Sequence, residues 1–457
     1  MPGPSPIMRP SALREERWHV VGAGKSGVAA ADLLVRAGAA QVVLLDEQPV
    51  SSWGVRPQDA SVQCAQIDLR SWIGDEVAHC VVSPGIPAGL WSRALDGRGV
   101  EIISEIELAW RLRAGAEPVV AVGGTNGKST TTSLIAHVLA SAGLRVFAGG
   151  NLGEPWSNHV TDVLDASIIE VSSFQLERVS MFKPTVSVLL NVTPDHLDRY
   201  ASFADYAAAK GRAFQCQDAH DLAVIPVNNT LCHREAARGG AAVVTFGAGG
   251  DVDVDGARIR DQRAGVLVDL NATRLRGGHN ALNIAAALAA LRPFALDAKC
   301  VVEAIASFEG LAHRTFLVRT VDGVTYYDDS KGTNVGASVT ALLGLSEAKA
   351  VLIAGGKDKG GGYEALVEAL QAKGRAVVTI GEAASLIEGA LRGRGEVLPV
   401  KRAGSMGEAV QLARAFACAG DAVLLSPACA SFDMFRDYKH RGDMFVDAVH
   451  ALQETPG

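Results

Sequence analysis

The stretch Val119–Ala140, VVAVGGTNGKSTTTSLIAHVLA, constrains the fold of this chain more than any other. It opens with an apolar run typical of a buried parallel strand and passes through a glycine-rich turn into a helix with apolar residues at helical spacing. Such a turn directs backbone N–H groups and the positive end of the helix at one point. The stretch therefore predicts a parallel α/β domain with a phosphate-binding loop.

The residues of the turn suit a nucleoside triphosphate. Lys128 is expected to reach the β- and γ-phosphates, and Ser129 to offer its hydroxyl to Mg²⁺. Val122 stands where the general phosphate-loop pattern has glycine, and the alternative is a tight strand–helix turn with a solvated lysine. The predicted ATP-binding loop comprises Gly124, Thr125, Asn126, Gly127, Lys128, Ser129 and Thr130.

Composition narrows the classes of protein that remain. A length of 457 residues allows about three domains. The net charge of −7 argues against a nucleic-acid partner, and no apolar run reaches the roughly 18 residues of a membrane span. Seven scattered cysteines without a CxxC pair favour a reducing compartment. Residues 1–17 lack the apolar centre of a signal peptide and are expected to form a flexible leader.

The region from Trp18 predicts a Rossmann-like sheet. An apolar run leads into Gly22–Gly27, a formal GxGxxG, and Asp46 ends the next apolar run about 20 residues further on. Taken alone, this pattern favours NAD, although any diphosphate ligand can use the same helix N-terminus. A later strand, beginning near Cys80, ends in a turn that contains Gly85.

Polar residues follow further strands of the central region. Glu170 ends a strand beside the phosphate loop and is placed either to hold Mg²⁺ or to cap the next helix. His196 lies in an Asp/His/Asp group that suits a metal site, a general base or a solvated turn. Lys210 lies on an amphipathic helical pattern, which by itself indicates a surface lysine. Asn283, near the start of an alanine-rich helix, suits either a purine contact or a cap.

Alternating strands and helices from near Leu311 predict a further doubly wound sheet. Three polar loops end its strands: Asp328–Asn334, Gly355–Gly360 and Ser426–Ser431. Because ligands collect beyond the carboxyl ends of parallel strands, these loops suit a dicarboxylate ligand, and the alternative is ordinary loop chemistry.

The motifs GTNGKST, GGNLGEPW, EVSSFQLE, NVTPDHLDRY, GGHNALN, HRT, DDSKGTN, GGKDKG and LLSPACASFDMFRDYKHRG occur in one order. With them, the chain from about Trp18 onward resembles the Mur ligases. The resemblance implies an α/β protein of three domains after the leader. These are a Rossmann-like UDP-substrate domain at 18–106, a central P-loop ATPase-type domain at 107–311, and a Rossmann-like glutamate-binding domain at 312–457.

The resemblance also implies an activity, the addition of D-glutamate to UDP-N-acetylmuramoyl-L-alanine (UDP-MurNAc-L-Ala) in cytoplasmic peptidoglycan precursor synthesis. ATP would convert the substrate carboxylate to an acyl phosphate, and the amine of glutamate would displace phosphate through a tetrahedral intermediate. The expected cofactors are ATP, Mg²⁺ at two sites and a carbamate on Lys210. The enzyme is expected to be a cytoplasmic monomer with small-molecule substrates only.

Residue roles are carried over from the family motifs. The implied catalytic residues are Lys128, His196, Lys210 and Lys331, and the implied metal ligands are Ser129, Glu170, His196 and the modified Lys210. ATP contacts beyond the loop are Asn283, Arg314 and Asp329. The UDP substrate would contact Lys25, Ser26, Asp46, Gly85, Asn151, Ser173 and His196, and glutamate would contact Thr333, Lys359 and Ser431.

The chain departs from the family pattern at two places. Gly332 stands where alanine is commoner, which we expect to be a mild change, and Asp46-Glu-Gln replaces a common Asp-Thr-Arg near the expected uracil. Two other classes of function stay open. An NAD-linked oxidoreductase would use Gly22–Gly27 and leave the phosphate loop unexplained, while a nucleotide-gated switch would leave Lys210, Lys359 and Ser431 unexplained.

Overall fold

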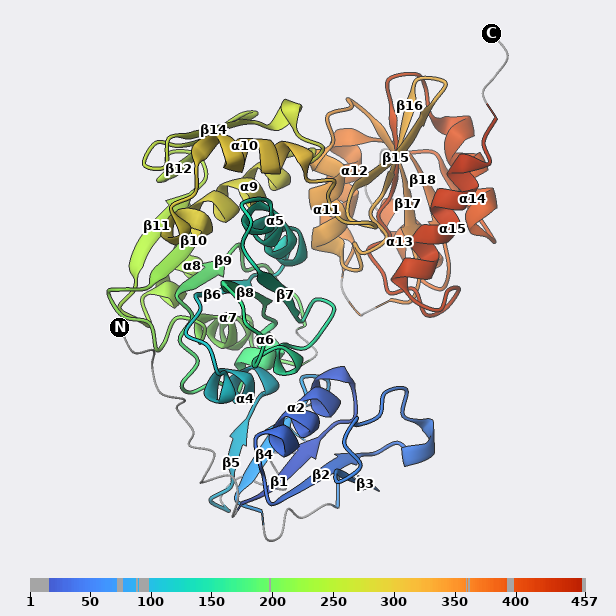
Figure 1. The fold of residues 1–457 in the computed structure, drawn as a ribbon. Coiled ribbons are helices and arrows are strands. Elements are labelled where there is room, and N and C mark those ends of the chain that lie inside the picture. The colour runs from blue at the N-terminus through green and yellow to red at the C-terminus, as the bar shows by residue number, and fades with distance from the viewer. Residues whose placement is uncertain are drawn as a thin grey trace. The chain divides into compact units, whose positions relative to one another are not determined.

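The computed structural model describes residues 16–71, 77–87, 89, 98–196, 199–358, 360, 362–392 and 398–453. The chain divides into two compact units. The N-terminal unit comprises Met1–Asp255, Ile259–Leu267 and Asn283–Ile305, and the C-terminal unit comprises Gly256–Arg258, Val268–Leu282 and Ala306–Gly457. Three largely parallel sheets with helices confirm the predicted α/β class (Figure 1).

The first sheet has the strand order β3-β2-β1-β4-β5, and all neighbours are parallel. Its strands are β1 (Arg17–Val21), β2 (Gln41–Asp46), β3 (Gln63–Gln66), β4 (His79–Val82) and β5 (Glu101–Ile103). Helix α2 (Lys25–Arg36) crosses from β1 to β2, and the short turn η1 (Val50–Ser52) follows β2. The helix begins directly after the glycine turn because Gly24 is its extended N-cap residue.

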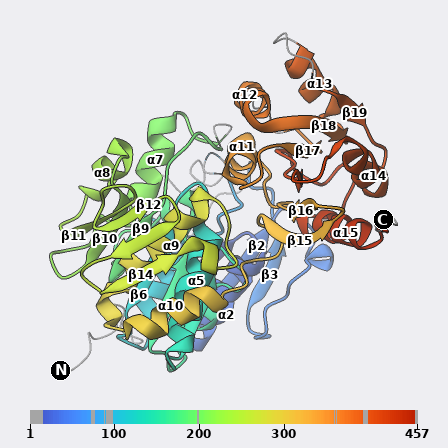
Figure 2. The same cartoon turned by 90° about the horizontal axis from the view of Figure 1, so that it is seen from above.

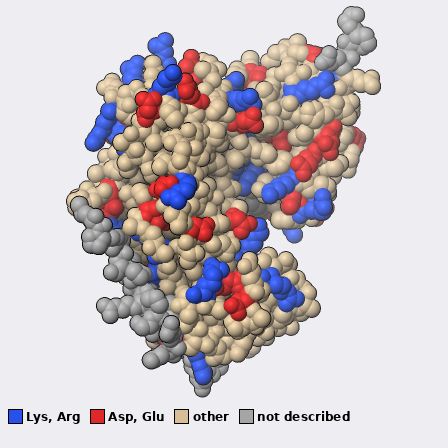
Figure 3. Space-filling model, in the orientation of Figure 1, with Lys and Arg blue, Asp and Glu red and all other residues tan. Residues whose placement is uncertain are grey.

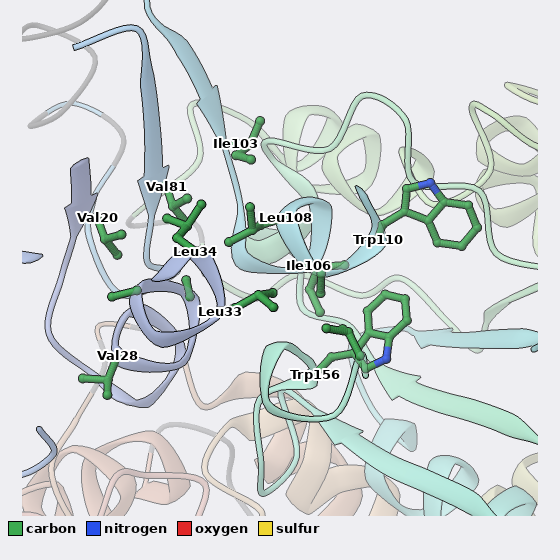
Figure 4. Packing of buried hydrophobic residues seen from close by; sticks show 14 of the residues in the cluster. Val20, Val28, Leu33, Leu34, Val81, Ile103, Ile106, Leu108, Trp110 and Trp156 are labelled. Carbon is green, nitrogen blue, oxygen red and sulfur yellow. The ribbon is translucent and has the colours of Figure 1, made fainter. Parts of the chain in front are cut away.

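One apolar core joins the first sheet to helix α4 (Glu105–Leu112) and the turn η2 (Trp156–Asn158). Leu33 and Leu34 of α2 lie between Val20 of the sheet and Ile106 of α4, and Trp156 closes the far end (Figure 4). Each fully buried side chain of this size contributes roughly 1.5–3 kcal/mol.

The central sheet has nine strands in the order β14-β13-β12-β11-β10-β9-β6-β8-β7. They are β6 (Val119–Gly123), β7 (Val146–Gly150), β8 (Ala166–Glu170), β9 (Val186–Leu189), β10 (Leu222–Pro226), β11 (Ala242–Phe246), β12 (Val252–Asp255), β13 (Arg258–Asp261) and β14 (Val266–Asp269). All five residues of β6 are buried, which explains its uninterrupted apolar run. The short strands β12 to β14 occupy one edge of this sheet.

The helices around the central sheet follow the expected alternation with strands. They are α5 (Lys128–Ser141), α6 (Ser173–Leu176), α7 (Phe203–Gly211), α8 (Thr230–Ala236), α9 (Gly278–Leu291) and α10 (Ala298–Ser307), with the turns η3 (Leu270–Ala272) and η4 (Arg292–Phe294). Helices α7 and α8 bury Tyr206 and Cys232 against β9 and β10. The phosphate loop follows the neighbouring strand β6, whose five residues are all buried.

The third sheet has the order β15-β16-β20-β17-β18-β19, and only the pair β15/β16 is antiparallel. Its elements are β15 (Phe316–Val321), β16 (Val324–Asp328), α11 (Val335–Gly344), β17 (Ala350–Gly355), α12 (Glu364–Lys373), β18 (Gly374–Ile380), α13 (Ala384–Arg392), β19 (Val400–Arg402), α14 (Met406–Phe416), β20 (Ala422–Leu425) and α15 (Tyr438–His450). Along β17, Leu352 shares an apolar cluster with residues of α11 and α12, and Ile353 shares one with residues of α14 and α15. Figure 2 shows these two pairs of helices on opposite sides of the sheet.

The described helices include none that is long and apolar enough to cross a membrane. Acidic and basic side chains are interspersed over the face drawn in Figure 3.

The buried carboxylate of Glu107, on α4, binds the backbone of the segment that follows α6. Glu107 has no exposed surface, and its carboxylate accepts hydrogen bonds from the backbone N–H groups of Met181 (2.9 Å) and Phe182 (3.0 Å). The Nε of Arg111 also donates to it, at 2.8 Å. A buried charge is tolerated here because a cation and several N–H groups surround it.

We expect Glu107→Ala to lower the free energy of unfolding of the N-terminal unit by about 3–5 kcal/mol, because several buried backbone N–H groups and the Nε of Arg111 lose their acceptor. Urea denaturation followed by tryptophan fluorescence measures the change. Glu303→Ala is the matched control, since that side chain is 67% exposed on α10, and it should shift stability by no more than about 0.5 kcal/mol. Equal effects of the two variants would contradict the anchoring role.

Candidate functional site

The glycine-rich turn between β6 and α5 has the geometry that the sequence predicts. Gly124 and Gly127 have φ angles of +142° and +86°, and Gly127 is the left-handed N-cap residue of α5. The side chain of Asn191, after β9, fixes the turn from outside. It accepts from the N–H of Asn126 at 2.9 Å and donates to the Asn126 carbonyl at 3.1 Å.

Two lysines converge on one carbonyl of this loop. The Nζ of Lys128 donates to the carbonyl oxygens of Gly124 (2.9 Å) and Thr125 (2.8 Å). The Nζ of Lys210 also donates to the Gly124 oxygen, at 2.8 Å. Two ammonium groups this close repel each other strongly in a buried site, so one of them is favoured in the neutral form.

Lys210 is the more deeply buried of the two lysines, and its pKa is lowered. Its side chain on α7 is only 3% exposed, so the interpretation of this residue as a surface lysine is wrong. Burial, together with the Lys128 ammonium, lowers the pKa of Lys210 well below its usual value, although Asp195 and Glu170 oppose the shift. The sequence pattern does not predict this burial, because the residues that pack over Lys210 come from other parts of the chain.

Oxygen ligands lie beside the loop. The hydroxyl of Ser129 donates to one carboxylate oxygen of Glu170, and the side-chain amide of Asn151 donates to the other at 2.6 Å. Glu170 is not the helix cap, because Ser172 caps α6 in a capping box with Gln175. Mg²⁺ in proteins is held by one or two carboxylates together with substrate phosphates and waters, and this pair of oxygen donors fits that pattern.

His196 and Asn283 approach the same loop from other elements. The ring centroid of His196 lies 6.3 Å from that of Tyr206, whose hydroxyl is 3.1 Å from the Thr125 hydroxyl. Asn283 of α9 abuts the loop so closely that a Cβ at Gly127 would lie 2.4 Å from its side-chain oxygen. The described residues contain no group of three or more His, Cys, Asp or Glu side chains that is placed to hold a metal.

The first sheet carries a second polar edge in the N-terminal unit. Asp46 accepts from the N–H of Ala23 at 2.7 Å, and the hydroxyl of Ser83 donates to the Gly22 carbonyl at 2.8 Å. These bonds join the glycine turn, the end of β2 and the loop after β4. The predicted Lys25 and Ser26 begin α2 at this edge, and Gly85 and Ser173 lie in the loop after β4 and at the start of α6.

In the C-terminal unit, the three polar loops meet at the carboxyl edge of the sheet. Lys357 and Ala430 exchange backbone hydrogen bonds of 2.9 and 3.0 Å, and the N–H of Ala428 donates to the Gly332 carbonyl at 2.9 Å. Thr333 and the buried Ser431 lie on these loops, and Lys331 lies 4.9 Å from the ring centroid of Tyr438. The predicted Lys359 lies outside the described residues.

The carboxyl group of Asp329, in the loop after β16, has a raised pKa. Burial raises its pKa to about 7, although the Ser426 hydroxyl, which donates to it at 2.6 Å, and Arg314 favour the ionised form. The N–H of Thr315 donates to the other carboxylate oxygen at 3.0 Å. Arg314 and Asp329, both predicted to contact ATP, are therefore electrostatically coupled.

Comparison with known proteins assigns the family. The description "Mur ligase middle domain" matches residues 122–291, and "Mur ligase, glutamate ligase domain" matches residues 313–429. The UDP-N-acetylmuramoylalanine–D-glutamate ligase of Geobacter metallireducens is 41% identical over 95% of this chain and 97% of its own. The enzyme of that name from Geotalea daltonii is 40% identical over 96% and 98%. The chain belongs to the Mur ligase family.

Solved structures agree with this fold. The UDP-N-acetylmuramate–alanine ligase MurC of Thermotoga maritima matches with a TM-score of 0.59 and 19% identity, covering 95% of this chain and 99% of its own. The MurF ligase of the same organism, solved in complex with ADP, matches with a TM-score of 0.59 and 18% identity over 96% of each chain. Mur ligases carry out ATP-dependent ligation in peptidoglycan precursor synthesis, and this chain is an enzyme of that kind.

Arg199 of this Mur ligase is a site-forming residue that the sequence reading missed. Its guanidinium donates to the carbonyl of Pro84 at 2.7 Å and to a carboxylate oxygen of Glu177 at 3.1 Å, and lies 3.9 Å from the ring centroid of Phe174. It thereby ties the loop after β4 to the turn that carries His196. An arginine in a polar turn is ordinarily exposed to solvent, so the sequence pattern alone does not predict this contact.

Gly332 is not the mild change that we expected. A Cβ at this position would lie 2.5 Å from a carboxylate oxygen of Asp329 and 2.6 Å from the hydroxyl of Ser426, which are closer than real contacts. The Ser426 hydroxyl and the Asp329 carboxylate can form their hydrogen bond in this position because residue 332 has no side chain. Alanine in this loop would require the Asp329 carboxyl to move.

The raised pKa of Asp329 makes the C-terminal unit sensitive to pH. The folded pKa of about 7 exceeds the unfolded value of 3.8, so the folded state binds this proton more tightly between these values. We expect the melting temperature of the unit to fall as pH rises from about 4 to about 7. Asp329→Asn should flatten this dependence, as followed by calorimetry, whereas an unchanged slope would contradict the assignment. Asp447→Asn, on the exposed face of α15, is the control.

Proposed function

We propose that this enzyme joins D-glutamate to UDP-MurNAc-L-Ala with conversion of ATP to ADP and phosphate. The observation that carries the proposal is the meeting of Lys128, Lys210 and the Ser129–Glu170 pair around one phosphate loop. It is supported by relatives of 38–41% identity that are named UDP-N-acetylmuramoylalanine–D-glutamate ligase. The ADP complex of the T. maritima MurF ligase supports nucleotide binding by an enzyme of this fold.

The proposed reaction proceeds by activation of a carboxylate. The L-alanyl carboxylate attacks the γ-phosphorus of ATP and forms an acyl phosphate, and ADP leaves. The amine of D-glutamate then attacks the acyl carbon, loses a proton, and expels phosphate as the amide forms. Lys128 and the backbone N–H groups of the loop stabilise charge on the transferring oxygens. Mg²⁺, held by Ser129 and Glu170, would supply further electrostatic stabilisation.

Lys210 is proposed to act as a carbamate. Its neutral amine attacks CO₂, forms an N–C bond and releases one proton, so that an uncharged amine becomes an anion with two oxygens. The lowered pKa and the burial of Lys210 supply the neutral amine that this step requires. With His196, the carbamate would provide ligands for a second Mg²⁺.

The other roles follow the motifs. The proposed UDP-substrate contacts are Lys25, Ser26, Asp46, Gly85, Asn151, Ser173 and His196. The proposed ATP contacts are the loop from Gly124 to Thr130 with Asn283, Arg314 and Asp329. The proposed glutamate contacts are Thr333, Lys359 and Ser431, with Lys331 as a catalytic cation beside them. A division into domains at 106/107 and 311/312, a monomeric state and a cytoplasmic location belong to the same proposal.

Substrate dependence tests the function. Phosphate release from ATP should require both UDP-MurNAc-L-Ala and D-glutamate, and mass spectrometry should detect the glutamyl product. Release without either substrate would indicate a nucleotide switch. Calorimetry should detect UDP-MurNAc-L-Ala bound to the enzyme and no NAD, so tight NAD binding would overturn the assignment of the first sheet.

Lys210→Ala tests the carbamate. The variant should lose about 100-fold or more in kcat, because a buried anionic ligand is removed from the site of charge development. Acetate or propionate in the buffer should restore part of the rate, since a short carboxylate replaces the carbamate oxygens. Lys299→Ala, at a side chain that is 83% exposed on α10, should keep the wild-type rate with or without the acid. Normal turnover of Lys210→Ala in CO₂-free buffer would exclude the carbamate.

A further inference from the structure

Arg441, on α15, is a fully buried arginine to which neither the motifs nor the proposed reaction assigns a role. Its guanidinium lies beneath the three polar loops of the C-terminal unit. Nε donates to the hydroxyl of Ser330 at 3.0 Å, and one terminal nitrogen donates to the Ser330 carbonyl at 2.8 Å. The other donates to the carbonyls of Cys429 (3.1 Å) and Ala430 (3.2 Å).

These acceptors are the immediate neighbours of proposed glutamate-site residues. Ser330 precedes Lys331, and Ala430 precedes Ser431. The third loop comes within reach because position 356 is glycine: a Cβ there would lie 3.2 Å from a terminal nitrogen of Arg441 and 2.2 Å from the Ala430 oxygen. A single planar group therefore binds the loops after β16 and β20, and the loop after β17 packs closely against it at Gly356.

The charge of Arg441 is not cancelled by a direct partner. Its four acceptors are neutral oxygens, and the described residues include no carboxylate in an ion pair with it. Burial lowers its pKa to about 10, while the nearby Asp328 and Asp329 act in the opposite direction. A buried cation of this kind is costly, and one that lies behind an anion-binding edge lowers the electrostatic energy of a bound dicarboxylate.

We propose that Arg441 is a positioning residue for the amino-acid substrate. It holds Lys331 and Ser431 at the separation that a dicarboxylate requires and contributes positive potential to that edge without touching the ligand. The inference rests on the proposed function, because it assumes that these loops bind glutamate. It predicts that substitution of Arg441 raises the KM for glutamate independently of its effect on the stability of the fold.

The experiment compares Arg441→Lys and Arg441→Gln in the full-length enzyme by steady-state kinetics. Arg441→Gln should raise the KM for glutamate about tenfold or more, because both the charge and the forked hydrogen bonds are lost. Arg441→Lys keeps the charge and should show a smaller rise. The KM for UDP-MurNAc-L-Ala, whose proposed contacts lie in the N-terminal unit, should stay within about twofold of wild type in both variants.

Arg292→Lys is the matched control, because Arg292 is a largely buried arginine that pairs with Asp261 in the N-terminal unit. It should lower the melting temperature and leave the KM for glutamate unchanged. Parallel rises in both substrate KM values for the Arg441 variants, or an unchanged KM for glutamate, would overturn the inference.

Ser330→Ala provides a second route should the Arg441 variants fail to fold. It removes the hydroxyl acceptor of Nε and leaves the arginine in place, so the KM for glutamate should rise by about two- to fivefold. An unchanged KM for glutamate in this variant would also count against the positioning role. Failure of the wild-type enzyme to release phosphate in a glutamate-dependent manner would instead refute the proposed function itself.

Discussion

The carbonyl oxygen of Gly124 is the acceptor around which the charged groups of the glycine-rich loop are arranged. It receives hydrogen bonds from both Lys128 and Lys210. A strand buried on both faces leads to it, and Asn191 fixes the turn from the neighbouring strand. Because two charged amines cannot share so small a buried space cheaply, burial and the neighbouring Lys128 favour the neutral form of Lys210 and lower its pKa. The same geometry places both lysine side chains within hydrogen-bond distance of one loop carbonyl.

Buried charged groups organise both units, and they do so by binding backbone. Glu107 gathers N–H groups of the segment after α6, whereas Arg441 gathers carbonyl oxygens of the loops after β16 and β20. Irregular backbone has no repeating hydrogen-bond partners of its own, so one multivalent side chain can satisfy several groups at once. Arg199 works in the same manner on the loop after β4.

Local patterns in the sequence were enough to predict the α/β class and the polar strand ends. The glycine turn before Lys128 and the loop around Asp329 each follow directly after an apolar run that forms a strand. Their positions could be predicted because a buried parallel strand is recognisable from its own residues, and ligand-binding loops follow the carboxyl ends of such strands. The burial of Lys210, the reach of Arg199 and the tight packing at Gly332 were not predictable, because each depends on contacts between segments far apart in the chain. The roles of the individual residues stay predictions.

The packing at Gly332 has a consequence for sequence change in this family. The space that a methyl group would occupy is filled by the carboxyl of Asp329 and the hydroxyl of Ser426. A chain with alanine at this position must seat that carboxyl differently, so the residues around it form one interdependent set. Alanine alone at position 332 of this protein is therefore expected to displace the Asp329 carboxyl, and substitutions at positions 329, 332 and 426 are expected to have non-additive effects on stability.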